Sequence, residues 1–292
     1  DVARATGVRL QISHLKTAGR ANWGKLDAAL ESICAAQAEG LSVASDRYPY
    51  TASCTDLDVI LPEWAAQGGR SAILARLRDP SERAKIRAEL AAEREEAYWE
   101  GVWVGSTRHP DNARFAGQPI RNAAEAWKLH PLDAALRFME TDELFTGGIF
   151  FGMSEDNLWR ILAEPWVMIG SDASIRSPTG SLSHDHPHPR AYGTFGRFLR
   201  AALDGKTVSV GEAVRKMTSL PAEQFRLTDR GAIQAGAFAD VVVLDPATFR
   251  DLATYENPHQ FCEGISAVWV NGVLTLRSGQ ETGERGGRYL TA

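Results

Sequence analysis

The chain has 292 residues, 44% of them hydrophobic, and a formal net charge of −5 at pH 7. This length allows one large domain or two modest ones, and a mildly acidic chain without a basic stripe argues against nucleic acid as the main partner. No apolar run approaches the roughly 20 residues that a membrane-spanning helix needs, so we expect no membrane association.

The cysteines and the first residues indicate the compartment. Cys34, Cys54 and Cys262 are far apart and form no C-x-x-C pair, which excludes a zinc ribbon and argues against a disulfide framework. Three isolated cysteines are most typical of a protein in the reducing cytoplasm. The first ten residues lack the basic start and apolar middle of a signal peptide. They are typical of a helix end, with Gly7 as the stop and a strand from Val8, so we expect the chain to be part of something longer.

Strand and helix signals alternate in the first fifty residues. Hydrophobic residues recur at a period of two from Val8 to Ile12, which predicts a strand. Asn22 is the expected cap of a helix that Gly40 ends, and a second strand follows at 41–45. A strand, a helix and a strand within about 35 residues predict a βαβ unit and therefore a parallel sheet.

The middle of the chain breaks this rhythm. Residues 62–150 are highly charged and interrupted by prolines, which predicts a helical insertion. Ser154 is the expected cap of the next helix, which leads to an apolar strand, WVMIG, at 166–170. Further helices are expected near Phe195–Leu203 and, from a capping box, from Ser209 to about Thr218.

From about residue 230 the pattern is that of β-structure. A buried strand is expected at 241–244, and Asn271-Gly272 joins two further strands with the strongest short hairpin signal. We therefore expect a small antiparallel β-domain at 227–292, after an α/β part at 1–226.

Functional side chains of parallel α/β sheets and barrels gather where the strands end, and three strand ends here are polar. His14 and Lys16 follow the first strand, Tyr48 and Tyr50 the second, and Asp172 the apolar strand. A histidine in this place can bind zinc, and a lysine can bind a carboxylate. On spacing alone, a hydrogen-bonded core histidine and a solvated lysine are the commoner cases.

Asp172 begins a polar stretch that ends at Arg190. A carboxylate at the mouth of an apolar strand is costly to bury unpaired, so Asp172 needs a partner. Beside a metal it could carry a proton from water to a leaving nitrogen, and capping of the next helix is the alternative. A guanidinium such as that of Arg190 can bind a carboxylate with two parallel hydrogen bonds.

Between Asp172 and Arg190, three histidines form H-x-H-x-H, at His184, His186 and His188. Pro187 and Pro189 are expected to hold this segment extended, so the three rings could share one side and a metal. A proline-rich run is usually a loop, however, and loop histidines are more often solvated than metal-bound.

Taken together, these segments resemble the N-acyl-D-amino-acid deacylases, or D-aminoacylases, of the amidohydrolase superfamily. The motifs follow in the right order from about Val8 to Gly287: ISHLK, NWGK, YPYTASCT, LPEW, MIGSDAS, HPHPRAYGTF, AVRKMTSLPAE, RGAIQAGAFADVVVLDP, ENPHQ and GISAVWVNGV. The resemblance implies an α/β fold: the last strands of a (β/α)8 TIM barrel with a helical insertion, and a small C-terminal antiparallel β-domain.

The resemblance also implies a reaction, in which zinc (one or two Zn2+ ions) assists hydrolysis of the amide of an N-acyl-D-amino acid. The products are a carboxylate and a free D-amino acid. His14 matches a metal ligand of the family, and Asp172 matches an aspartate at the metal site that serves as general base and acid.

Four further matches imply substrate contacts. Lys16 and Arg190 match residues that bind the substrate's α-carboxylate, and Tyr48 matches the tyrosine of the YPY motif, which also contacts the substrate. Cys54 stands where the family often has a serine that helps to bind the substrate. His184 and His188 fit the family's loop pattern as residues that shape the loop, and the resemblance gives His186 no role.

Two alternatives stay open. A cyclic-amide hydrolase, of the hydantoinase or dihydroorotase kind, shares the generic segment GAFADVVVLD but not the carboxylate-binding residues. The second is a catalytically inactive fragment. The family has an H-x-H on its first strand, usually a cysteine after the second and a histidine on the fifth, and this sequence contains none of them at those places. The resemblance therefore implies that most metal ligands lie in a preceding part of the protein.

Overall fold

A three-stranded parallel sheet lies at the centre of the computed structural model, which describes residues 1–290. Its strands are β1 (Leu10–Ile12), β2 (Val43–Arg47) and β7 (Val167–Ile169), in the order β1-β2-β7. Both neighbouring pairs are parallel. Helix α2 (Leu26–Ala38) connects β1 to β2, so the predicted βαβ unit is confirmed.

The first helix boundaries follow local chemistry, with one exception. Helix α1 (Val2–Thr6) ends at Gly7, which has a left-handed φ of 67°, as predicted. The prediction that Asn22 caps α2 is wrong. A 3-10 helix over Arg20–Lys25 precedes α2, and the Asn22 amide donates to the carbonyl of Ala18 instead. The chain is thus already helical before α2 begins.

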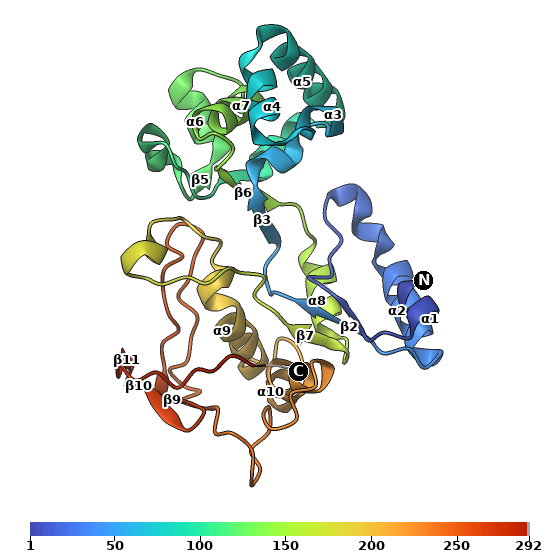
Figure 1. Cartoon of the computed structure of the whole chain (residues 1–292), viewed down its shortest axis with the longest axis vertical. Helices are drawn as coiled ribbons and strands as arrows, with labels where there is room; N and C mark the ends of the chain where they lie inside the picture. The colour runs from blue at the N-terminus through green and yellow to red at the C-terminus, as the bar shows by residue number, and fades with distance from the viewer. Residues whose placement is uncertain (291–292) are drawn as a thin grey trace.

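Residues 52–151 form a lobe that stands apart from the parallel sheet (Figure 1). Its base is an antiparallel sheet in the order β3-β6-β4-β5. These strands are β3 (Ala52–Asp56), β6 (Gly147–Phe151), β4 (Val102–Val104) and β5 (Gln118–Pro119). The helices of the lobe are α3 (Glu63–Ala66), α4 (Gly69–Arg78), α5 (Pro80–Glu93), α6 (Ile120–Trp127) and α7 (Pro131–Thr141).

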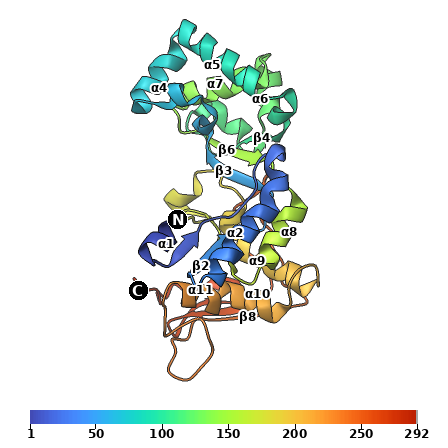
Figure 2. The ribbon, with the colours of Figure 1, turned by 90° about the vertical axis from the view of Figure 1, so that its right-hand side faces the viewer.

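The predicted insertion, about 62–150 and helical in parts, therefore begins ten residues later than the lobe does, and its strands were not foreseen. The strands at its two ends were missed because β3, with the sequence ASCTD, has no hydrophobic alternation, and because β6 begins with two glycines. The lobe has its own hydrophobic core, in which Ile86, Leu90 and Phe138 are fully buried. Figure 2 shows the lobe extending away from α2, α8 and the rest of the chain.

Two helix starts confirm the capping predictions. Helix α8 (Glu155–Ala163) begins after Ser154, whose Oγ accepts a hydrogen bond from the Asn157 backbone at 3.2 Å. Helix α10 (Val210–Met217) begins after Ser209, whose Oγ accepts from the Glu212 backbone at 3.3 Å. Both helices pack on β7, which leads to Asp172.

Helix α9 (Arg190–Leu203) starts earlier than predicted, at Arg190 itself. Pro189 has helical dihedrals, φ −57° and ψ −17°, and is not extended as expected. Gly193 and Gly196 let the C-terminal segment approach this helix closely, because a Cβ at Gly196 would lie 2.2 Å from Cys262 Sγ. The segment therefore fixes α9, and with it Arg190.

The C-terminal part contains the predicted antiparallel sheet, in the order β11-β10-β9-β8. The strands are β8 (Val241–Leu244), β9 (Ile265–Val270), β10 (Val273–Arg277) and β11 (Gln280–Glu281), and a short helix, α11 (Ser219–Gln224), precedes them. Asn271 and Gly272, with φ of 50° and 80°, form the predicted hairpin turn.

The predicted burial of β8 is wrong. Val242 and Val243 in the middle of this strand are 55% and 46% exposed. The apolar composition predicted a covered strand, but within residues 1–290 this part of the sheet is left open to solvent. No helix in this same range is long and apolar enough to cross a membrane.

Candidate functional site

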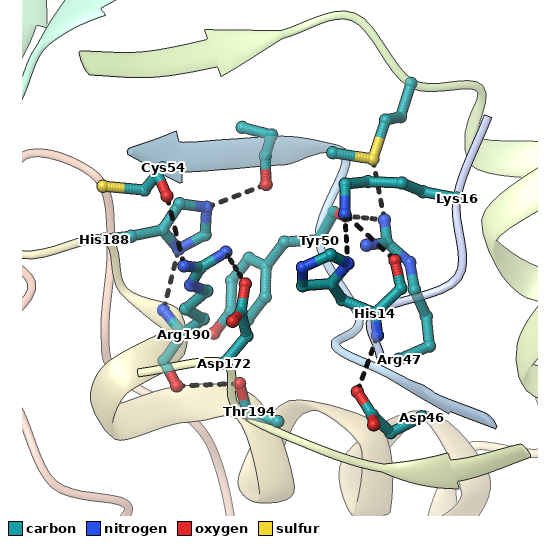
Figure 3. A network of polar contacts seen from close by, with 12 residues as sticks. His14, Lys16, Asp46, Arg47, Tyr50, Cys54, Asp172, His188, Arg190 and Thr194 are labelled. Atoms are coloured by element: carbon teal, nitrogen blue, oxygen red, sulfur yellow. Dashed lines mark hydrogen bonds and ion pairs between the residues drawn. The ribbon is translucent and has the colours of Figure 1, made fainter. Parts of the chain in front are cut away.

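The predicted site residues follow the carboxyl ends of the three parallel strands. His14 comes two residues after β1, Tyr48 directly after β2, and Asp172 three residues after β7. Parallel strands end at one edge of their sheet, so residues far apart in sequence meet there. Figure 3 shows His14, Lys16, Asp172 and Arg190 at this edge.

His14 has a left-handed backbone, with φ 42°, which is uncommon for a residue other than glycine. Its N–H donates to Asp46 Oδ1 at 2.8 Å, and Asp46 Oδ2 accepts from the Gln11 amide at 2.8 Å. Asp46 thus stabilises the turn that presents the imidazole. Asp46 was not predicted from the sequence, and its place near the end of β2 was the signal that could have found it.

Lys16 lies against the same imidazole. Its Nζ is 2.7 Å from His14 Nδ1 and donates to the His14 carbonyl at 3.0 Å. Burial, and then the charge of Arg47, lower the pKa of Lys16 to about 8. A protonated lysine can only donate, so Nδ1 accepts here and the proton of the neutral ring is on Nε2.

This contact has a consequence for metal binding. If His14 ligates a metal through Nε2, the ring proton moves to Nδ1, where an ammonium group cannot accept it. If Nδ1 is the ligand, the metal takes the place of the Lys16 ammonium. In both cases metal ligation breaks the contact between the Lys16 ammonium and the His14 ring and leaves the ammonium, still bonded to the His14 carbonyl, able to donate to a further partner.

Asp172 forms an ion pair with Arg190. Asp172 Oδ2 lies 2.9 Å from Arg190 Nη1, although the angles do not make this a directed hydrogen bond. Arg190 Nη2 donates to the Cys54 carbonyl at 3.3 Å. Cys54 therefore holds Arg190 through its backbone, and this contact does not depend on whether the side chain is a thiol or a hydroxyl. Burial raises the pKa of the Cys54 thiol.

His188 fixes the start of α9, and the expectation of a solvated loop histidine is wrong for it. It is 3% exposed. Its Nδ1 accepts from the Arg190 backbone N–H at 2.9 Å, which places the ring proton on Nε2, 3.1 Å from the Ala52 carbonyl. Burial, and then the charge of Arg190, lower the pKa of His188 to about 3, so the ring is neutral at pH 7.

We expect this neutral histidine to make stability fall with acid. Between pH 6.5 and about 3 the unfolded chain binds a proton at His188 that the folded protein excludes, so the free energy of unfolding decreases as pH falls. His188→Gln can keep the bond to Ala52 and does not titrate. When the pH is lowered from 6.5 to 4.5, the free energy of unfolding measured with denaturant should fall by about 2 kcal/mol more for wild type than for this variant. Equal losses in both proteins would refute this assignment.

The other two loop histidines, His184 and His186, do not lie with His188. His184 is exposed. The His186 N–H donates to Ser106 Oγ at 3.0 Å, and its ring Nε2 lies 2.7 Å from the Tyr255 carbonyl. The run bends into α9, so the rings do not converge on one point. Over residues 1–290, no group of three or more His, Cys, Asp or Glu side chains could hold a metal.

Tyr48 lies between two guanidinium groups. The Cζ of Arg47 is 4.1 Å, and that of Arg190 4.7 Å, from the ring centroid. Tyr48 is fully buried, and its hydroxyl has no hydrogen-bond partner in the described part of the chain. Arg47 is buried as well, and the sequence analysis gave it no role.

Two side chains at this edge are of types that bind zinc. An imidazole and a carboxylate, those of His14 and Asp172, are ordinary zinc ligands. They fit the metal in type, but they make up only part of the usual four-ligand set.

Comparison with known proteins agrees with this chemistry. The model of the amidohydrolase family matches residues 153–276. The chain is 36% identical over 290 residues to an N-acyl-D-glutamate deacylase of Alcaligenes xylosoxydans xylosoxydans, covering 99% of this chain and 49% of the relative. It is 35% identical over 291 residues to a D-aminoacylase of the same organism, covering 99% and 50%.

A solved structure shows the same fold. It is an N-acyl-D-glutamate deacylase from Bordetella bronchiseptica, complexed with zinc and a phosphonate inhibitor that mimics the tetrahedral intermediate. The match has 32% identity and a TM-score of 0.71, and it covers 94% of this chain and 48% of that one. The chain thus spans about half the length of the relatives that it matches, and its residues 153–276 form a segment of the amidohydrolase family.

Proposed function

We propose that the chain carries part of the active site of a zinc-dependent N-acyl-D-amino-acid deacylase. The single observation that carries the proposal is the meeting of His14, Lys16, Asp172 and Arg190 at one edge of the parallel sheet. The relatives named N-acyl-D-glutamate deacylase and D-aminoacylase support the choice of reaction. In this proposal β1, β2 and β7 are the last strands of a (β/α)8 barrel, and the other metal ligands come from a segment outside residues 1–292.

Lys16, Tyr48 and Arg190 bind the substrate's α-carboxylate. The Arg190 guanidinium can donate two parallel hydrogen bonds to it, and the bond to the Cys54 carbonyl fixes its direction. The substrate's carboxylate then replaces Asp172 as the partner of Arg190, so the aspartate becomes free to transfer a proton. The buried Tyr48 hydroxyl, which lacks a partner here, gains an acceptor.

Asp172 moves the proton in the reaction. The oxygen of a water molecule attacks the amide carbonyl carbon, and Asp172 takes the proton from this water. The carbon–nitrogen bond then breaks, and Asp172 delivers the proton to the leaving nitrogen of the D-amino acid. His14 and Asp172, with further ligands, would hold a zinc ion, and the bound ion would supply Lewis-acid chemistry, polarising the carbonyl and acidifying water. The carboxylate clamp keeps the amide in place for attack.

A substrate panel tests the proposal on the complete protein loaded with zinc. We expect N-acetyl-D-amino acids to be hydrolysed with kcat/KM at least about 100-fold above that for the L-enantiomers, because the clamp fixes the α-carboxylate on one side of the amide. Hydantoin and dihydroorotate should not react. Turnover of these rings, with none of the N-acyl-D-amino acids, would instead favour a cyclic-amide hydrolase. A protein consisting of residues 1–292 alone is the control and should be inactive.

A further inference from the structure

Arg47, the last residue of β2, is a buried cation that has no carboxylate partner among residues 1–290. Its side chain is 1% exposed. Nη2 donates to the Tyr50 carbonyl and lies beside the Met153 sulfur, both at 2.8 Å. Nε and Nη1 are buried with no hydrogen-bond partner in residues 1–290. Burial of a charge in this way costs several kcal/mol unless another interaction offsets it.

The neighbouring carboxylate side chains do not offset the cost of burying Arg47. Arg47, Lys16 and Arg190 are three cations around one edge, whereas Asp172 and Asp46 are the two carboxylates near them. Asp172 already pairs with Arg190. Asp46 is occupied by the Gln11 amide and the His14 N–H. These five side chains together carry one more positive than negative charge, and a zinc ion held by Asp172 would increase this excess, so the cluster favours an anion. Figure 3 shows Arg47 beside Lys16 in this cluster.

Tyr48 connects Arg47 to the substrate clamp. The ring of Tyr48 contacts the guanidinium of Arg47 as well as that of Arg190. A cation over an aromatic ring stabilises by about 0.5–2 kcal/mol, which is less than the cost of burying the charge. Stacking alone thus does not compensate for the burial of Arg47. The Tyr48 hydroxyl also favours the charged guanidinium, but it makes no directed hydrogen bond within residues 1–290.

We propose that Arg47 is a further positioning residue of the carboxylate site, which holds the Tyr48 ring in place and provides the positive charge that the substrate's carboxylate balances. This inference rests on the proposed deacylase function. The Arg47 guanidinium stacks on the Tyr48 ring and donates to the Tyr50 carbonyl, so Arg47 acts through Tyr48 and through its field, without touching the substrate.

The test compares a charged substrate with a neutral one. In the complete zinc-loaded protein, Arg47→Met removes the charge and keeps most of the bulk, whereas Arg47→Lys keeps the charge. Each variant is assayed with the best N-acetyl-D-amino acid of the panel and with its C-terminal carboxamide. Arg197→Met is the matched control, because Arg197 is exposed and its guanidinium lies 4.8 Å from the ring centroid of Tyr50.

Arg47→Met should raise KM for the acid by about 10- to 100-fold, because the lost field acts on bound carboxylate. Its kcat/KM for the carboxamide should stay within about threefold of wild type, and Arg47→Lys should restore most of the KM for the acid. Arg197→Met should behave as wild type with both substrates.

Four results would overturn the proposal. Equal losses for acid and carboxamide in Arg47→Met would give the residue a merely structural role, and an unchanged KM for the acid would give it none. If Arg47→Met does not fold, Arg47→Lys decides. A rise in its KM for the acid of more than about 30-fold would show that a positive charge at this position does not by itself support binding of the carboxylate. A wild-type protein that hydrolyses no N-acyl-D-amino acid overturns the deacylase function itself, together with this role. An active wild type with an unaffected Arg47→Met overturns the role alone.

Discussion

Asp172→Asn in the complete zinc-loaded protein should lower kcat for an N-acetyl-D-amino acid by about 100- to 10,000-fold, because general acid–base catalysis is worth about 10²–10⁴. An amide has nearly the shape of the carboxyl group, but it cannot take the proton of water and pass it to the leaving nitrogen. Asp172 has a left-handed backbone, with φ 49°, and asparagine tolerates this conformation as well as aspartate does. The fold should therefore survive.

Zinc content separates this effect from loss of the metal. The variant should retain most of its zinc after dialysis, measured by elemental analysis, since an amide oxygen can still lie near the metal and most ligands are expected elsewhere. Asp156→Asn, an exposed aspartate in α8, is the control and should keep full activity. Full activity in Asp172→Asn would show that the proton carrier is another group.

Arg190→Met is expected to reduce kcat/KM for N-acetyl-D-amino acids by about 100- to 1,000-fold, chiefly through KM, because a buried charge-assisted pair is worth about 3–5 kcal/mol when one partner is removed. Arg190 is buried, holds the Cys54 carbonyl and pairs with Asp172. Arg190→Lys should recover little of the loss, since one ammonium cannot bind the carbonyl and grip a carboxylate with two parallel bonds.

Steady-state kinetics with the acid and its carboxamide check this prediction. Arg190→Met should lower kcat/KM for the carboxamide much less than for the acid, because the carboxamide has no charge for Arg190 to bind. Arg197→Met, on the same helix and exposed, should match wild type. If Arg190→Met kept the wild-type KM for the acid, the carboxylate would have to be bound elsewhere.

Elements with strong local signals were predicted correctly. The capping hydroxyls of Ser154 and Ser209, the stop at Gly7 and the turn at Asn271-Gly272 each satisfy backbone groups within a few residues. Such contacts form from adjacent sequence and need no distant partner. Asn22 was misread because a preceding 3-10 helix, which left no clear signal, took over the start of α2.

Elements whose stability comes from distant partners were missed. β3 and β6 pair with each other across about ninety residues of the lobe, and neither has an alternating hydrophobic pattern. β8 was expected to be buried because it is apolar, yet exposure depends on what covers the strand. The same holds for His188, whose burial depends on Ala52 and on the docking of α9.

By itself, the sequence determined the caps at Ser154 and Ser209 and the hairpin turn, because each depends on neighbouring residues. It also indicated the βαβ unit and the order of the polar strand ends, because the strand and helix signals follow one another along the chain. Only the tertiary structure decided that Asp172 pairs with Arg190, that Asp46 holds His14, and that Arg47 and Arg190 share the ring of Tyr48. The physical reason is that charge pairing and burial depend on distances in space, which are set by the packing of strands and helices far apart in the chain.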